Sequence, residues 1–350
     1  MAQIDKPNLH FNIVTYSNAG DGAKAVTGVG FQPDLVWLKN RTSAYHGQIH
    51  DAVRGASAGA LYTSTAAVED SGYPISSFDS DGFTTGSQST NISQNSASQV
   101  AWNWKAGNSA GSSNTDGSIT STVSANTTAG FSIVKWAGNS SASATVGHGL
   151  GATPACIICK EMNGTDYWHM YHQDLTTNHN LFLNVTNASS APSDGTLANV
   201  GSSTFGFQGS TNVVAVNESG KNNIAYCFVE KKGYSKFGKY TGNGNANGTF
   251  VYTGFVPSFV MIKRTDAITD WMMFDNKRTD GNPNLVNKYL LANDSGTEGS
   301  NSTTGVDFLS NGFKSRNTFA SVNASGGSYT YMAFAENPIV GSNNSAATAR

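Results

Sequence analysis

The amino-acid sequence repeats one pattern three times, and this repetition constrains the fold more than any other feature. Each copy begins with a Gly, has a Pro three to five residues later, continues as an apolar run that ends in Lys, and closes with an aromatic run and an Asp. The three copies are residues 30–51, 149–174 and 254–275. Their starts lie roughly a hundred residues apart, which is the size of a domain rather than of a solenoid repeat. The sequence therefore predicts three tandem domains of one architecture.

Matching segments flank each copy and set the expected boundaries. An aromatic strand-like segment precedes the copies at residues 11–16, 131–136 and 237–240. A Gly-Phe pair and a closing aromatic run follow each of them, the runs being 101–104, 225–228 and 331–334. We therefore expect an N-terminal arm and first domain at 1–107, a linker at 108–116, a second domain at 117–233, a third at 234–339 and a C-terminal tail at 340–350.

The residue pattern indicates strands rather than helices. The chain has 38 Gly residues, and its short runs of Val, Ile, Phe, Tyr and Trp alternate with turn residues, while no helical apolar stripe extends over three turns. We predict an all-β protein in which each domain is an antiparallel β-sandwich of the jelly-roll or lectin-like type. The runs 34–39, 155–160 and 258–263 are apolar on both faces, so we expect them to be interior strands that are covered on both sides.

Composition excludes several functional classes. Only 13% of residues are charged and the formal net charge is −2, which argues against a nucleic-acid-binding surface. The sequence contains no apolar segment long enough for membrane insertion and begins without the pattern of a secretory signal. Three Cys residues cannot form a disulfide framework. Because the surface composition is nevertheless typical of extracellular proteins, we expect a virion component that is made in a cytoplasm and released by lysis.

No familiar motif predicts catalysis, a metal or a cofactor. Cys156 and Cys159 are three residues apart on a predicted strand, so their side chains face opposite sides and cannot share a zinc ion. Both align with apolar residues of the other copies and are interpreted as small apolar core residues. Four histidines have different spacings in two copies and no counterpart in the third, and are expected at surfaces or interfaces: His46, His50, His169 and His172. Nucleophile, phosphate-loop and paired-carboxylate patterns are missing.

One recurring polar set is the candidate ligand or interface site. Each copy has a Trp, a Lys that ends the central strand and an Asp that ends the aromatic run: Trp37, Lys39 and Asp51; Lys160, Trp168 and Asp174; Lys263, Trp271 and Asp275. If the two strands form a hairpin, Lys and Asp could share an ion pair or cap a turn. Alternatively, the set could form three polar ligand sites in which Trp rings stack on sugars. Because Trp271 begins a run of four apolar residues, we expect it in a core.

With the repeat laid out, the sequence resembles structural and tail fibre-type virion proteins of marine bacteriophages, including those of cyanobacteria. The residues that carry this resemblance are 131–136, 254–263, 271–275 and 311–313, and the similarity covers about 11 to 338. It implies a non-enzymatic virion protein, with other virion proteins as partners, that assembles as a homo-oligomer. The role expected first is a tail-associated fibre or appendage contacting the host surface, with a host glycan as a ligand. The alternative is a capsid or tail decoration protein that stabilises the particle without binding the host.

Overall fold

The computed structural model describes residues 2–18, 20, 22–72, 75–87, 91–191, 196–209, 215–279, 285–300 and 305–340. The predicted tail at 340–350 therefore lies outside the described residues except for Val340. In the described residues the chain is almost entirely β, and the only α-helix is the four-residue α1 (Ala320–Asn323). The strands pair antiparallel within the sheets. The all-β prediction is therefore confirmed. Across the described ranges, no helix is long and apolar enough to span a membrane.

The first repeat consists of a large and a small sheet. Its large sheet has the order β1 (Phe11–Ser17), β8 (Ser98–Trp104), β3 (Leu35–Asn40), β4 (Gln48–Asp51) and β5 (Leu61–Tyr62). The small sheet consists of β2 (Ala25–Thr27), β7 (Gly82–Thr85) and β6 (Ile75–Asp79). Two short 3-10 helices, η1 (Pro7–Leu9) and η2 (Asn91–Ser93), complete this part of the chain.

The second repeat has the same plan with two more strands. Its large sheet has the order β15 (Leu181–Phe182), β14 (His169–His172), β13 (Cys156–Glu161), β18 (Asn222–Phe228), β11 (Phe131–Ala137), β10 (Ser121–Asn126) and β9 (Ser112–Asn114). The small sheet consists of β12 (Thr145–Gly147), β17 (Thr204–Gln208) and β16 (Thr196–Ala198). Strand β9 lies within 108–116, which we expected to be a linker, and its pairing with β10 makes this segment part of the sheet instead.

The third repeat again keeps the central strand order. Its large sheet has the order β19 (Ser235–Thr241), β28 (Ser328–Pro338), β21 (Phe255–Arg264), β22 (Met272–Asp275), β24 (Lys288–Leu291) and β25 (Gly299–Ser300). The small sheet consists of β20 (Phe250–Tyr252), β27 (Gly312–Ser315), β26 (Val306–Leu309) and β23 (Leu285–Val286). The orders β1-β8-β3-β4, β11-β18-β13-β14 and β19-β28-β21-β22 are thus equivalent.

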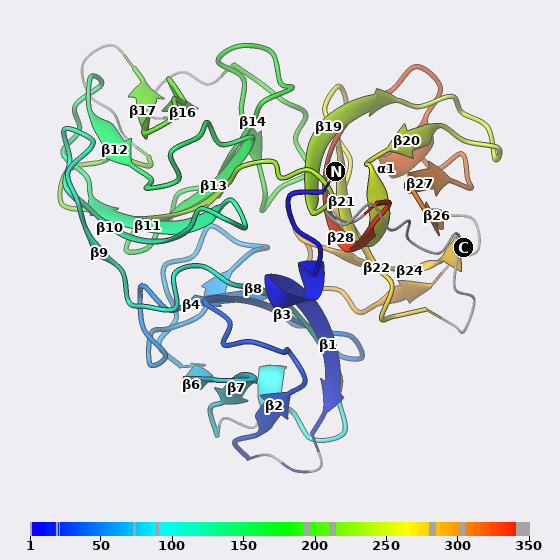
Figure 1. The fold of residues 1–350 in the computed structure, drawn as a ribbon, viewed down its shortest axis with the longest axis horizontal. Coiled ribbons are helices and arrows are strands. Elements are labelled where there is room, and N and C mark those ends of the chain that lie inside the picture. Colours follow the sequence, from blue (N-terminus) through cyan, green and yellow to red (C-terminus); the bar gives the residue numbers. More distant parts are fainter. Residues whose placement is uncertain are drawn as a thin grey trace.

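Side chains alternate along a strand, so each large sheet has two faces. Both faces are covered. The outer faces pack against the small sheets and form three separate hydrophobic cores. The inner faces of all three large sheets meet in one central core. In β13, for example, Ile158 points into the central core and Ile157 into the outer core of the second repeat. Figure 1 shows the three lobes arranged around this centre. The expectation of interior strands buried on both sides is therefore confirmed.

Aromatic rings from different repeats touch in the central core. Phe11 packs on Phe334 with ring centroids 4.9 Å apart. Trp104 lies edge-on to both Phe228 and Phe259, with ring centroids 6.2 Å apart in each pair. Such contacts add about 0.5–1.5 kcal/mol each beyond the burial of apolar area. The three sandwiches are thereby joined into one body.

The three cysteines fill apolar positions, as the alternation of side chains predicts. Cys156 lies opposite Phe228 and points into the central core, whereas Cys159 points into the outer core of the second repeat, as does Cys227. All three are free and buried, and burial raises the pKa of each thiol. Within the part of the chain that the structure describes, no group of three or more His, Cys, Asp or Glu side chains could hold a metal ion.

Candidate functional site

Nearly all of the predicted Trp, Lys and Asp residues lie where two repeats meet. We call these contact zones seam 1–2, seam 2–3 and seam 3–1, after the repeats that they join. In each seam a loop amide of one repeat donates a hydrogen bond to the carbonyl of the residue just after the central strand of the next. The three bonds, of 2.8, 2.8 and 2.9 Å, join Glu69 to Met162, Ser189 to Thr265 and Glu298 to Arg41. The seams are therefore equivalent in position, which gives the molecule an approximate threefold arrangement.

Two of the predicted tryptophans anchor neighbouring repeats. The indole nitrogen of Trp168 donates a hydrogen bond to the carbonyl of Tyr62 in the first repeat, at 2.8 Å. That of Trp271 donates to the carbonyl of Phe182 in the second repeat, at 3.0 Å. Trp168 is 0% exposed and Trp271 is 2% exposed. Both rings therefore lie in the central core, as expected for Trp271, and cannot stack on a sugar at the surface.

Trp37 is not the structural counterpart of these two residues, although the candidate site grouped it with them. Trp168 and Trp271 directly precede β14 and β22. Gly47 occupies the same place before β4. Trp37 instead lies within the central strand β3, opposite Ile49. The loops before the three strands are equally long, at 41–47, 162–168 and 265–271. They differ in composition, because the first ends in Gly and the other two end in Trp.

The space that a Trp at position 47 would need is filled by other side chains. A Cβ atom added at Gly47 would lie 2.6 Å from the hydroxyl oxygen of Thr63 and 3.3 Å from the indole nitrogen of Trp37. The Thr63 hydroxyl also donates a hydrogen bond to the carbonyl of Ala292 across seam 3–1, at 2.9 Å. Thr63 thus makes the contact between repeats that the indole makes in the other two seams.

The three predicted lysines are fully buried at the same end of the central strands. The ammonium of Lys39 donates to the carbonyl of Asp294 at 2.6 Å across seam 3–1, and that of Lys263 to the carbonyl of Thr186 at 3.1 Å across seam 2–3. Lys160 bonds within its own repeat, to the carbonyls of Glu161 and Gly164. Burial lowers the pKa of each lysine to about 8, because it penalises the charged form.

The predicted pairing of these lysines with the aspartates does not form. Asp51 lies opposite Leu35 at the start of β3, whereas Lys39 lies at the other end of that strand. Asp275 is placed as Asp51 is, opposite Phe259. In the second repeat the equivalent position is held by His172 rather than by Asp174, which lies two residues further on. Strand register, which the sequence pattern did not reveal, separates these groups.

Asp51 instead belongs to a buried ionic triad at seam 1–2. Its carboxylate accepts hydrogen bonds from the guanidinium of Arg54 at 2.6 Å and from the hydroxyl of Tyr226, in the second repeat, at 2.8 Å. Arg54 also lies 3.3 Å from the carboxylate of Glu69. The Asp51 and Arg54 side chains are 0% and 2% exposed. Buried charges are tolerated only when paired and hydrogen-bonded, as they are here.

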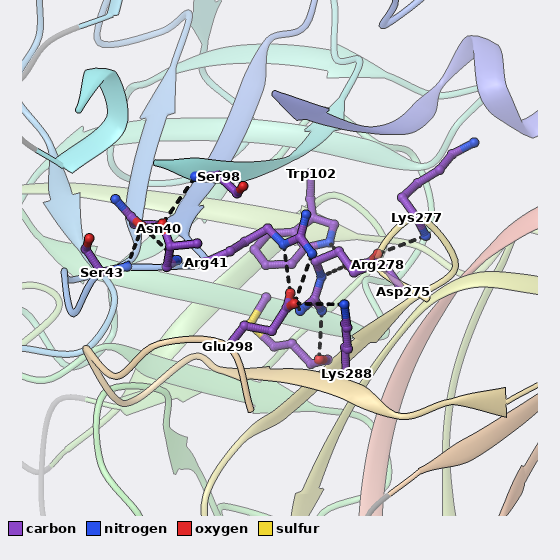
Figure 2. Close-up of polar contacts among 12 residues, drawn as sticks. Asn40, Arg41, Ser43, Ser98, Trp102, Asp275, Lys277, Arg278, Lys288 and Glu298 are labelled. Carbon is purple, nitrogen blue, oxygen red and sulfur yellow. Dashed lines mark hydrogen bonds and ion pairs between the residues drawn. The ribbon is translucent and has the colours of Figure 1, made fainter. Parts of the chain in front are cut away.

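Seam 3–1 repeats this triad and extends it, as Figure 2 shows. The carboxylate of Asp275 accepts hydrogen bonds from Arg278 at 2.6 Å and from the indole nitrogen of Trp102, in the first repeat, at 3.0 Å. Arg278 bonds to Glu298 at 3.0 Å, and Glu298 also pairs with Arg41 of the first repeat at 2.8 Å. Neither triad was predicted from the sequence, although an Asp-x-x-Arg pattern is present at 51–54 and 275–278.

Among the described residues of seam 2–3 this triad is absent, because its counterparts are His172, Leu175 and Ser189. The Nε2 atom of His172 lies 3.1 Å from the carbonyl of Tyr331 in the third repeat, and its Nδ1 accepts a hydrogen bond from the backbone amide of Asp174. Burial lowers the pKa of this imidazole, so the neutral ring with a proton on Nε2 satisfies both contacts. Neutral side chains therefore replace the ion pairs in this seam.

The fold and the seams together define an all-β protein built from three equivalent sandwiches around a common core. The chain belongs to the family described as "Domain of unknown function (DUF7483)", whose model matches residues 6–338. The match spans all three repeats and their seams. Comparison with curated proteins and with solved structures gives no match.

Proposed function

We propose that this protein is a non-enzymatic structural protein of a bacteriophage particle, a tail-associated appendage that contacts the host surface. The observation that carries the proposal is the central core shared by the three repeats. Parts that share one core cannot open and close as separate domains do, because separation would expose apolar surface to water. A stiff body of this kind suits a component that holds its shape while attached to a particle.

The chemistry of the seams also supports a structural role. The buried carboxylates of Asp51 and Asp275 each accept hydrogen bonds from an arginine and from an aromatic donor of another repeat. The buried lysines donate to backbone carbonyls. Groups engaged in this way hold the repeats together and do not face a cleft where a substrate could react. The resemblance of the repeated pattern to phage virion proteins agrees with this assignment.

The position of the protein in the particle tests the proposal. Antibodies raised against the recombinant chain are bound to purified particles of the encoding phage and located by immunogold electron microscopy, with antibody pre-absorbed on the recombinant chain as the control. Gold at the tail, together with slower adsorption to host cells, is the expected result. Gold over the capsid shell without an effect on adsorption would favour a decoration protein. Absence of the chain from purified particles would overturn a virion role altogether.

A further inference from the structure

Seam 2–3 contains a polar pocket with a volume of about 430 Å³. Its walls come from the loops after β14 and β15 in the second repeat and from β19, β28 and the residue after β21 in the third repeat. Hydroxyl side chains dominate the lining: Thr176, Ser189, Thr241, Thr265, Ser328 and Thr330. The carboxylate-bearing Asp174 and the ammonium-bearing Lys239 also line it. The volume falls within the range of roughly 300–1,000 Å³ that is usual for sites that bind small molecules.

The pocket lies where the other two seams carry ion pairs. The pocket-lining residues Leu175 and Ser189 hold the positions that Arg54 and Glu69 have in the first repeat. In the third repeat the same positions are those of Arg278 and Glu298. Shorter, neutral side chains at these two positions leave space that the arginines and glutamates take up elsewhere. In the other two seams, therefore, ion-paired side chains occupy the space that is open in this pocket.

The wall from the third repeat differs from its counterparts in polarity. Thr330 lies opposite Lys263, in the register position that Val100 has opposite Lys39 and Ile224 has opposite Lys160. A hydroxyl therefore replaces an aliphatic side chain only beside the pocket. Lys239 lies opposite Thr330, and its counterparts are the uncharged Thr15 in the first repeat and Lys135 in the second.

Several polar groups of the pocket have capacity for a ligand. Among the described residues, neither the carboxylate of Asp174 nor the ammonium of Lys239 has an ion-pair partner within 4.0 Å. The hydroxyls of Ser189 and Thr265 donate to the carbonyls of Thr265 and Ser328, at 3.0 and 3.2 Å. Their oxygen lone pairs can still accept hydrogen bonds. The pocket thus offers a strong acceptor, a strong donor and several hydroxyls.

We propose that this pocket binds a saccharide unit. Each sugar hydroxyl both donates and accepts, so neighbouring hydroxyls can donate to the Asp174 carboxylate and accept from Lys239 and the threonines. One cation beside one anion does not favour a multiply charged phosphate ligand. The rings of Tyr240 and Tyr329 stack on each other with centroids 4.8 Å apart, so recognition rests on hydrogen bonds. This inference rests on the proposed contact with the host surface and names its site and ligand class.

Residues of the sister repeats supply variants that keep the fold. Lys239→Thr introduces the residue found at position 15, and Thr330→Val the residue found at position 100. The double variant Leu175→Arg with Ser189→Glu reproduces the ion pair of the other seams and fills the pocket. Lys135→Thr is the matched control, because Lys135 is the counterpart of Lys239 in the second repeat and lies outside the pocket.

Binding to the full chain is measured by titration calorimetry and ligand-observed NMR with galactose, mannose, N-acetylglucosamine, glucuronic acid and inorganic phosphate. We expect at least one saccharide to bind, K239T and T330V each to weaken it about tenfold, as loss of one hydrogen bond does, and L175R/S189E to abolish it. K135T should bind as the wild type does.

Three results would overturn the inference: no saccharide binds, only phosphate binds, or a saccharide still binds to L175R/S189E while that variant melts as the wild type does. If L175R/S189E does not fold, saccharide binding by K239T and T330V that is as strong as in the wild type would overturn the inference instead. Saccharide binding by a protein that is absent from phage particles would leave this site standing and overturn the proposed function. Presence at the tail without saccharide binding would overturn this site and leave the proposed function standing.

Discussion

The indole nitrogen of Trp102 lies 3.0 Å from the carboxylate of Asp275, so the first repeat donates a hydrogen bond to a buried acid of the third. Tyr226 and Asp51 have the same relationship, 2.8 Å apart, between the second repeat and the first. In both cases an aromatic side chain from the centre of a large sheet reaches the aspartate at the end of a neighbouring hairpin. These contacts couple the stability of one repeat to the structure of the next.

Replacing Asp275 by Asn should destabilise the whole protein. The change leaves the guanidinium of Arg278, which is 0% exposed, without its closest counter-charge. Removing one partner of a buried ion pair costs about 3–5 kcal/mol. We expect a loss of this size in the free energy of unfolding, measured by urea denaturation. Asp266→Asn is the control, because its pair with Arg264 is partly exposed and should be worth less than about 1 kcal/mol. Equal effects of the two substitutions would contradict the importance of the triad.

Trp271→Ala should cost about 3–5 kcal/mol of unfolding free energy, because it removes a large buried ring and leaves a cavity. Trp271→Phe should cost less, about 1–3 kcal/mol, because it mainly leaves the carbonyl of Phe182 without its donor. Tyr252→Ala serves as a control at a residue that is 60% exposed, where a change within about 0.5 kcal/mol is expected. A W271A protein as stable as the wild type would show that this ring does not support seam 2–3.

Gly47→Trp should be strongly destabilising by itself, because the new side chain would meet Thr63 and Trp37. Overpacking of this kind costs about 1–3 kcal/mol or more. Adding Trp37→Ile, the residue of the second repeat at that register position, should restore part of the loss. A double-mutant cycle in urea measures the coupling, expected at about 1–3 kcal/mol in favour of the double variant. Additive effects of the two substitutions would mean that Trp37 does not occupy the missing indole's space.

The buried lysines predict how stability changes in alkaline solution. Burial lowers the pKa of Lys263 to about 8 in the folded protein, below the value of about 10.4 for an unfolded chain. At pH values between these two pKa values, Lys263 is protonated in more of the unfolded molecules than of the folded ones, so the free energy of unfolding rises with pH. The free energy of unfolding of the wild type should therefore increase relative to that of Lys263→Met as the pH rises from 8 to 10. A difference that stays constant, or that falls, would show that Lys263 has an ordinary pKa.

The shared core predicts that the chain unfolds as one unit. Calorimetry of the full chain should give a single transition, because separating one repeat exposes the inner face of its large sheet. A fragment that covers 112–230 alone should aggregate or remain without fixed tertiary structure, which near-ultraviolet circular dichroism would detect. Three separate transitions, or a fragment as stable as the full chain, would contradict a common core.

Local patterns in the sequence were sufficient for the fold class and for several burial assignments. Alternation along strands predicted that Cys156 and Cys159 point to opposite faces, and the strand register agrees. The apolar run that begins at Trp271 predicted a core position for that ring. These properties depend on the backbone geometry of a strand and on neighbours a few residues away, which one sequence contains.

The partners across the seams were decided by the tertiary structure. Asp51 and Tyr226 are 175 residues apart in the sequence, and no local rule connects them. Lys39 and Asp51 recur together in the sequence but lie at opposite ends of the antiparallel β3–β4 pair, because pairing register is set by packing over the whole sheet. The sequence alone determined three copies of a strand-rich unit with apolar inner faces. How those faces meet, and therefore which charges pair and where a pocket remains, depended on the packing of three sheets around one core.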